Sequence, residues 1–230
     1  MRIITLVFAL FFTLNLSAQS YAFGIKGGLT VGFQRWDESF QRDALYRYHG
    51  IAFIESAPEG NEFAVFAQAG YHVKGSAIRT FRTTVETPTG FVAVPSQTIP
   101  FEFRNASLTL GGKKKYDLGV ASKMYYLLGV RGDYTVSTKL RPDFVSEENP
   151  YAILFPFDGF VNKFNYGISL GGGLGFPFSE YIAGVIEFTV NPDFSRQYNQ
   201  PEIPNVINPN PNFGSSRITI RERQIVNTTF

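Results

Sequence analysis

The sequence predicts an all-β protein, an antiparallel, transmembrane, up-and-down β-barrel of about eight strands. Three observations predict it: runs with a two-residue period, turn-forming residues between those runs, and connections that alternate between long and short. The clearest run, residues 21–33, alternates apolar or aromatic residues with small or polar ones. Its length fits a membrane, because a tilted strand crosses a bilayer in about 9–11 residues, whereas strands of soluble domains average about 5–6.

The segment before this run, residues 1–18, is typical of a secretory signal peptide. Arg2 precedes a short apolar stretch, and the segment closes on Ser17 and Ala18. A basic start, a short apolar core and small residues at the end mark a cleaved export signal. We therefore expect residues 19–230 to form the mature barrel domain, located in the outer membrane of the cell.

Composition excludes several classes of function. No later stretch approaches about 18 consecutive apolar residues, so only strands can cross a membrane. The formal net charge of +2 gives no bulk electrostatic case for binding nucleic acid. The 230-residue chain has no cysteine, so disulfides give no information about its compartment. We expect outer-membrane lipid, and no nucleic acid, to contact the chain.

Further alternating runs follow in order, and turn-forming residues separate them. The predicted strands are residues 46–56, 62–75, 101–111, 123–140, 160–176, 181–190 and 217–230. Ile51 and Phe53 break the alternation of the first of these runs. A slip of phase near Asn105 predicts a β-bulge, where one extra residue interrupts the pairing.

The connections predict which end of the barrel faces which compartment. Outer-membrane barrels carry long loops outside the cell and short turns in the periplasm. The long segments are residues 34–45, 76–100, 141–159 and 191–216, and the short ones are 57–61, 112–121 and 177–180. Lys113, Lys114 and Lys115 lie in one of these turns, where we expect them to be solvated. A soluble barrel of the lipocalin type is the main alternative fold, but its inward face should be apolar.

The inward-facing positions carry many charges. A barrel of about eight strands has an interior that side chains fill, and buried charges must be paired. We therefore expect a network of ion pairs rather than a wide pore. Its candidates are Lys26, Arg47, Glu55, Glu62, Lys74, Glu102, Arg104, Arg131, Asp133, Lys163 and Glu187.

No pattern in the sequence predicts catalysis, a cofactor or a metal. His49 and His72 fall at neighbouring inward positions, but no third ligand or oriented nucleophile accompanies them. The glycines of residues 171–175 lack the lysine of a phosphate-binding loop and lie inside a predicted strand. We interpret them as space for bulky neighbours such as Arg131 or Arg104.

The last long connection differs in composition from the others. It is rich in proline and asparagine, which resist both helix and sheet, and proline lowers the entropy lost on docking. It is therefore the best candidate for a partner-binding surface. The residues concerned are Pro201, Pro204, Asn208, Pro209, Asn210 and Pro211.

The last predicted strand departs from a lipid-facing pattern. Phe230 fits the aromatic end that barrel-assembly signals usually carry, but Arg217, Arg221 and Arg223 do not suit a lipid-facing surface. We expect either that this charged part extends above the membrane or that the native chain continues past Phe230.

Three segments carry a resemblance to a known family. Residues 21–29, just after a Ser-Ala-Gln cleavage site, resemble the opening of the outer-membrane β-barrel proteins of the Bacteroidetes. Within them, residues 110–119 (Leu-Gly-Gly-Lys-Lys-Lys-Tyr-Asp-Leu-Gly) and 187–194 (Glu-Phe-Thr-Val-Asn-Pro-Asp-Phe) are similar to the PorT-like branch. PorT-like proteins are tied to the type 9 secretion system. The resemblance therefore implies a non-enzymatic role in export or assembly, with secretion-machinery proteins as partners.

Three functional hypotheses follow from the sequence. The first is an accessory or assembly component of type 9 protein secretion that is not an enzyme. The second is a small barrel for surface adhesion or narrow solute passage. The third is a lipid-modifying enzyme, which would need His49 or His72.

Overall fold

The computed structural model describes most of the chain that follows the predicted signal peptide. The described residues are 20–36, 42–57, 63–87, 90–118, 122–142, 145–146, 148–179, 181–209 and 216–230. The predicted signal peptide, residues 1–18, and the predicted inward residue Glu62 lie outside them.

The two-residue alternation of the sequence produces long strands. Those of the large sheet are β1 (Ser20–Trp36), β2 (Asp43–Ala57), β3 (Phe63–Thr80), β6 (Gln97–Asp117), β7 (Lys123–Lys139), β8 (Phe164–Pro177), β9 (Ala183–Pro192), β10 (Tyr198–Gln200) and β13 (Arg223–Thr229). Two small sheets pair β4 (Thr83–Thr87) with β5 (Gly90–Val94), and β11 (Ile203–Ile207) with β12 (Arg217–Ile220). Two 3-10 helices, η1 (Pro150–Leu154) and η2 (Asp158–Phe160), precede β8.

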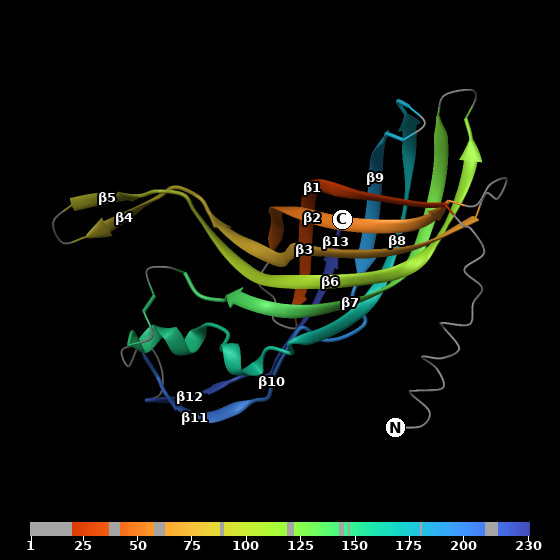
Figure 1. The fold of residues 1–230 in the computed structure, drawn as a ribbon. Coiled ribbons are helices and arrows are strands. Elements are labelled where there is room, and N and C mark those ends of the chain that lie inside the picture. The colour runs from red at the N-terminus through yellow and green to blue at the C-terminus, as the bar shows by residue number, and fades with distance from the viewer. Residues whose placement is uncertain are drawn as a thin grey trace, which may run out of the picture.

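The nine strands of the large sheet form a near-barrel. Their order is β1-β2-β3-β6-β7-β8-β9-β13-β10, and β13 also pairs with β1, which brings the sheet back on itself. All the pairings in this sheet are antiparallel. Figure 1 shows these strands curving around a common interior. The prediction of an all-β, antiparallel fold is therefore confirmed.

Most observed strands overlap the predicted ones, but several bounds differ. The long connections predicted at 76–100 and 191–216 contain strands of their own, β4 and β5 in the first and β10 and β11 in the second, and the strand predicted at 160–176 begins at Phe164. The turn predicted at residues 112–121 begins later, because β6 continues to Asp117 and places Lys113 inside the sheet. The strand predicted at 217–230 divides into β12, which pairs with β11, and β13, which joins the large sheet. The predicted bulge is confirmed, because the register of β6 on β7 shifts between Arg104 and Asn105.

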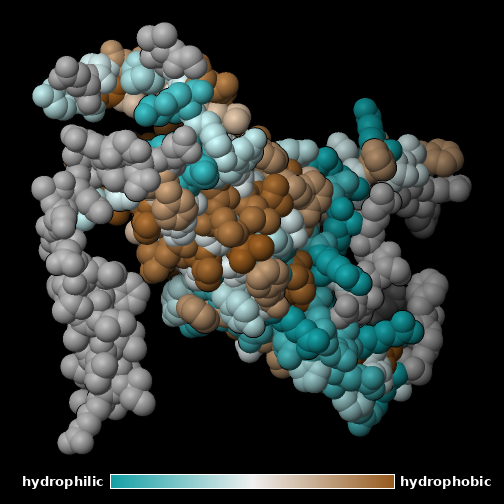
Figure 2. All heavy atoms as spheres, turned by 90° about the vertical axis from the view of Figure 1, so that its right-hand side faces the viewer, coloured by the Kyte–Doolittle hydropathy of each residue, from teal (hydrophilic) through white to brown (hydrophobic). Residues whose placement is uncertain are grey.

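Burial alternates along the strands and gives the sheet two different faces. In β7, Leu128 and Val130 are 59% and 68% exposed, whereas Leu127 and Arg131 beside them are 5% and 4% exposed. Figure 2 shows apolar residues gathered in the middle of one side of the molecule, with hydrophilic residues around them. The outer face of the sheet is therefore apolar where a soluble protein would be polar.

The long connections share one end of the near-barrel, which we call the cap end. The β4–β5 hairpin, the two 3-10 helices and the β11–β12 hairpin all lie there (Figure 1). Phe103, Leu140, Tyr198 and Ile225 form a small buried core at this end. We call the opposite end, where β8 turns into β9, the turn end. Within the described ranges, no helix is both long and apolar enough to cross a membrane.

Closure of the sheet is uneven along its length. β13 pairs with β1 from Gly32 to Trp36, and Val31 exchanges two backbone hydrogen bonds of 2.9 Å with Phe230. On its other side β13 pairs with β9 only at Asn191 and Pro192. Figure 1 accordingly places the C-terminus midway along the wall. The cap end of the ring is thus closed by β13, and the part nearer the turn end is not.

Gly75 of β3 gives a direct test of this packing. A Cβ atom there would overlap the backbone oxygen of Phe101 and lie 2.6 Å from Leu45 Cδ2, so neither side can accept it. We expect Gly75→Ala to lower the free energy of unfolding by about 1–3 kcal/mol, measured by urea unfolding in detergent micelles. Gly50→Ala is the matched control, because a Cβ at Gly50 meets nothing within 4 Å. Equal stability of the two variants would contradict the observed packing.

Candidate functional site

Charged side chains gather near the turn end in what we call the Lys26 cluster, formed by Lys26, Glu55, Lys113, Lys115 and Glu187. Lys26 Nζ on β1 lies 2.6 Å from Glu187 Oε1 on β9. Glu55 on β2 accepts hydrogen bonds of 2.7 Å from both Lys113 and Lys115 of β6. Because Lys113 Nζ also lies 3.8 Å from Glu187 Oε2, the cluster connects the four strands β1, β2, β6 and β9.

Aromatic rings surround the ammonium group of Lys113. Its Nζ lies 5.3 Å from the ring centre of Phe53, 5.4 Å from that of Phe66 and 4.7 Å from that of Tyr125. Such contacts stabilise a buried cation. They also explain why Phe53 interrupts the alternation of β2, because its ring faces the interior. The Tyr125 hydroxyl in turn donates to Glu187 Oε2 at 2.8 Å.

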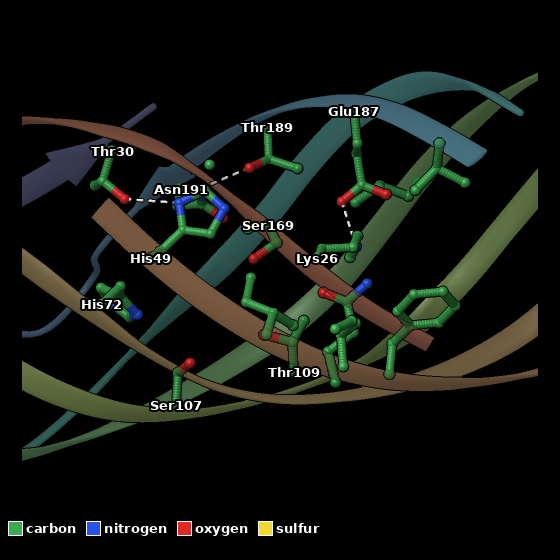
Figure 3. Close-up of a pocket in the computed structure, with 18 of the residues that line it drawn as sticks. Lys26, Thr30, His49, His72, Ser107, Thr109, Ser169, Glu187, Thr189 and Asn191 are labelled. Carbon is green, nitrogen blue, oxygen red and sulfur yellow. Dashed lines mark hydrogen bonds and ion pairs between the residues drawn. The ribbon is translucent and has the colours of Figure 1, made fainter. Parts of the chain in front are cut away.

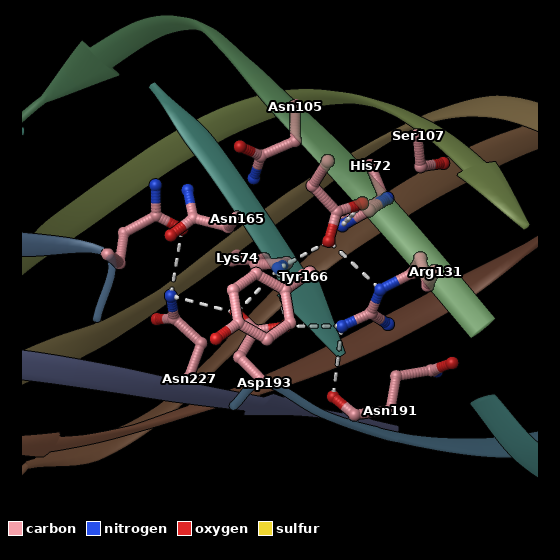
Figure 4. A network of polar contacts seen from close by, with 12 residues as sticks. His72, Lys74, Asn105, Ser107, Arg131, Asn165, Tyr166, Asn191, Asp193 and Asn227 are labelled. Carbon is pink, nitrogen blue, oxygen red and sulfur yellow. Dashed lines mark hydrogen bonds and ion pairs between the residues drawn. The ribbon is translucent and has the colours of Figure 1, made fainter. Parts of the chain in front are cut away.

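A second group of charges, the Asp193 cluster, lies nearer the cap end and consists of Lys74, Arg131, Asp133 and Asp193. Figure 4 shows how Lys74, Arg131 and Asp193 of this cluster converge. Lys74 Nζ donates to Asp133 at 2.7 Å and to both oxygens of Asp193 at 2.7 and 2.6 Å. Arg131 donates to Asp133 at 2.9 Å and to Asp193 at 2.5 Å. The two positive and two negative charges cancel, and each of the four residues is buried, at most 5% exposed.

His72 lies beside this cluster without joining it. Its Nε2 atom is 3.7 Å from Asp133 Oδ1, which is too long for a hydrogen bond. Neither atom has a hydrogen-bond partner among the described residues. His72 is 8% exposed, so its imidazole is enclosed by the protein.

A row of neutral polar side chains continues from the Asp193 cluster toward the cap end. Gln34 donates to Asn227 at 2.9 Å, and Asn227 donates to Gln197 at 3.0 Å. Gln197 donates to Thr135, and Thr135 donates to Asn105, at 2.7 and 2.9 Å. All five are buried, and their pairing into a network was not predicted from the sequence. Together with the cap-end core, the row fills that half of the interior.

A cavity of about 530 Å³ lies between the two charge clusters. Its walls include β1 from Phe23 to Thr30 and parts of β9, and Figure 3 looks into it. Thr30 Oγ1 lies 2.9 Å from His49 Nδ1. Among the described residues, no third side chain hydrogen-bonds to His49, so within them this pair lacks the relay that activates a nucleophile. Within the part of the chain that the structure describes, no group of acidic, histidine or cysteine side chains could hold a metal ion.

The predicted interior charges fall into these clusters to different degrees. Lys26, Glu55 and Glu187 belong to the Lys26 cluster, and Lys74, Arg131 and Asp133 belong to the Asp193 cluster. Arg47 donates to Glu102 at 2.8 Å, and Arg104 lies 3.3 Å from the same carboxylate. These three residues form a group of their own, in which Glu102 is buried and the two arginine side chains are partly exposed. Lys163 is exposed, because it precedes the start of β8.

Three charged residues of these clusters were not predicted as interior: Lys113, Lys115 and Asp193. All three continue the inward-facing alternation of β6 and β9 beyond the predicted strand ends at residues 111 and 190. Thr109 and Lys113 of β6 are both buried. Asp193 is buried too, and Asn191, two residues before it and facing the same way, is partly buried. If the two-residue alternation had been extended beyond the last apolar residues of each predicted strand, these three residues would have been predicted as interior.

The glycine-rich segment of β8 makes room for an aromatic ring. A Cβ atom at Gly173 would lie 2.6 Å from Tyr125 Cζ and 2.6 Å from the backbone oxygen of Ile186. The neighbour that occupies the space at this position is therefore Tyr125, and not Arg131 or Arg104. The segment pairs with β7 and β9 along its length, so it is part of the wall.

The predicted partner-binding loop is partly structured at the cap end. Pro204 lies in β11 and is exposed, as is Pro201 just before it. Asn208 and Pro209 follow β11, whereas the predicted residues Asn210 and Pro211 lie outside the described residues. The hairpin of β11 and β12 thus presents part of this segment beyond the large sheet (Figure 1).

Comparisons of this chain with protein-family models, with curated proteins and with solved structures find no match.

Asp193 is the residue whose replacement tests the central cluster. We expect Asp193→Ala to lower the free energy of unfolding by about 3–5 kcal/mol, because it leaves Lys74 and Arg131 buried with a single carboxylate between them. Urea unfolding in detergent micelles measures the change. Lys163→Ala, which removes an exposed charge, is the control and should stay within about 0.5 kcal/mol of the parent. A loss below about 1 kcal/mol for Asp193→Ala would show that these pairs do not stabilise the ring.

Proposed function

We propose that the near-barrel lies in the outer membrane as a barrel of about eight strands, and that the chain is a non-enzymatic accessory component of type 9 protein secretion. In this proposal the chain acts through contacts with secretion-machinery proteins. The observation that carries the membrane part is the apolar outer face of a ring whose interior is charged and polar.

The two faces of the wall support this placement. Leu128 and Val130 on β7, Ile186 and Phe188 on β9, and Ile25 on β1 are between 59% and 87% exposed. Exposing so much apolar surface to water is costly, whereas lipid accepts it. A membrane barrel has this distribution, with apolar side chains outward and polar ones inward.

The filled interior argues against solute passage. The Asp193 cluster and the row of polar side chains occupy the cap half of the ring, and the Lys26 cluster occupies the turn end. The cavity therefore lies between two groups of paired charges rather than along an open path. We expect no defined single-channel conductance when the purified protein is added to a planar lipid bilayer, and stable conductance steps would contradict this.

The secretion part of the proposal rests on the sequence resemblance. The segments that are similar to PorT-like proteins contain Lys113, Glu187 and Asp193, and all three are interior charges of the clusters described above. The similar residues therefore include groups that hold the ring together. The interior position of these charges supports a similarity in architecture, and the role in secretion is tested by the gene deletion described below.

Val130 provides a test of the membrane placement. We expect Val130→Arg to lower the stability of the protein in lipid vesicles by about 2–4 kcal/mol, because a guanidinium near the bilayer midplane loses its hydration. Phe91→Arg is the matched control, since Phe91 is 75% exposed on the β4–β5 hairpin beyond the large sheet. Similar small effects at both positions would argue against a wall in lipid.

A gene deletion tests the secretion role. We expect cells without the gene to lose secretion of type 9 cargo proteins, and the intact gene to restore it. Replacing residues 203–220, which include β11 and β12, by a short Gly-Ser linker should lower secretion while the ring still assembles. The control replaces residues 83–94, the β4–β5 hairpin, in the same way. Normal secretion in the deletion strain would overturn this role.

A further inference from the structure

The ring has a gap in its wall between residues 21–30 of β1 and 183–190 of β9, which we call the wall gap. Val31 exchanges both of its backbone hydrogen bonds with Phe230. Residues of an antiparallel strand alternate in the side to which their backbone groups point. Phe23, Ile25, Gly27 and Leu29 therefore direct their N–H and C=O groups into the wall gap, where no described strand pairs with them.

The opposite edge of the wall gap has the matching arrangement. The N–H of Asp193 donates to the backbone oxygen of Asn227 at 3.0 Å, so this residue points its backbone groups toward β13. By the same alternation, Val185, Glu187 and Thr189 direct their backbone groups into the wall gap. Their neighbours of opposite phase pair with β8. The unpaired edges of β1 and β9, which run parallel to each other because β13 is antiparallel to both, thus face each other across the opening.

The width of the wall gap suits one strand. Thr229 of β13 pairs with Gly32 on one side and with Asn191 on the other, so a single strand separates β1 from β9 at that level. Neighbouring strands lie about 4.7–4.9 Å apart, which sets the two edges about 10 Å apart. Further along, the side chains of Lys26 and Glu187 still meet at 2.6 Å beneath the opening (Figure 3).

We propose that the wall gap accepts a β-strand of a partner polypeptide, which runs antiparallel to both β1 and β9 and completes the ring. The strand would continue the line of β13 past Phe230 for about 30 Å, at roughly 3.3 Å per residue. This inference rests on the proposed function only in placing the wall in a membrane. There, backbone groups without partners are costly, and strand addition satisfies them.

The side chains around the wall gap specify the chemistry of that strand. On the outer face, Phe23 and Ile25 of β1 are 86% and 87% exposed, and Phe188 of β9 is 63% exposed. On the inner face, the cavity presents Lys26, Thr30 and other polar groups. The complementary strand has apolar residues at its outward positions and small polar residues at its inward positions.

The polar lining of the cavity favours a strand over a lipid chain. An acyl chain that entered the wall gap would lie against Lys26, Glu187 and His49 and would remove water from them without replacing its hydrogen bonds. It would also leave the strand edges unpaired. A peptide strand supplies backbone partners to both edges and polar side chains to the cavity.

The first experiment measures binding of a defined probe to the purified full-length protein in detergent micelles. The probe is a fluorescent ten-residue peptide that alternates valine and serine, and the control peptide has the same composition with its valines and serines in two blocks. We expect the alternating peptide to bind at least tenfold more tightly. Equal binding of the two peptides would overturn the proposal.

A second experiment locates the bound peptide. The chain has no cysteine, so a single introduced cysteine can be crosslinked without competition. Opposed residues of neighbouring strands lie about 4.5–5.5 Å apart at Cα, within the range that a disulfide bridges. A peptide with a cysteine at a central outward position should crosslink to Leu29→Cys and to Phe188→Cys, which lie at the same level on the two edges. Crosslinking of the closed-wall control Val130→Cys to the same extent would contradict the proposal.

Proline substitution tests the backbone pairing itself. Ile25→Pro removes one N–H that points into the wall gap and leaves the pairing with β2 in place, so it should weaken peptide binding at least tenfold. Ile25→Val keeps that N–H and should bind within twofold of the parent. Thr189→Pro is the corresponding variant on β9 if Ile25→Pro does not fold. Unchanged binding by a folded proline variant would overturn the proposal.

These readouts separate the strand site from the proposed function. Peptide binding in micelles does not depend on secretion, so its failure leaves the secretion assay to be judged by itself. Displacement of the bound peptide by a short-chain phospholipid would identify a lipid as the occupant and would overturn strand addition.

Discussion

The pairing of charges around Asp193 is the interaction on which the ring depends. Asp193 follows β9 directly, and its carboxylate accepts hydrogen bonds from Lys74 of β3 and Arg131 of β7. Its backbone N–H donates to the backbone oxygen of Asn227 in β13. Because buried charges are tolerated only when they are paired, these strands must stay in register for the cluster to exist. The cluster lies where β13 joins β9, so it stabilises the closed half of the wall.

The other half of the wall is held differently. Between residues 21–30 and 183–190 the edges are joined by an ion pair of Lys26 and Glu187 rather than by backbone hydrogen bonds. Side chains can span the distance that one missing strand leaves, but they do not provide hydrogen-bond partners for the backbone N–H and C=O groups along the two edges. Near the cap end β13 fills the space between β1 and β9, whereas nearer the turn end only side chains bridge the two strands. The wall gap is therefore a place where another strand fits. The proposed strand site rests on this asymmetry, and the proposed membrane placement rests on the apolar outer face.

Much of the wall could be predicted from the sequence, because alternation is a local property. The strand at 123–140 and the inward positions of Lys26, Arg131 and Asp133 follow from a two-residue period alone. Lys113 was missed because three consecutive lysines resemble a solvated turn, and its partner Glu55 is distant in the sequence. The wall gap depends on the register between β1 and β13, and such long-range pairing leaves no periodic signal.

Hydrogen exchange of individual backbone amides in the purified protein tests the central claim most directly, because it reports pairing along a single strand. We predict slow exchange for the β1 amides of Val31, Phe33 and Arg35, whose N–H groups point toward β13 where it pairs. The amides of Phe23, Ile25, Gly27 and Leu29 should exchange much faster in the absence of an added strand. Uniformly slow exchange along β1 would contradict an open edge.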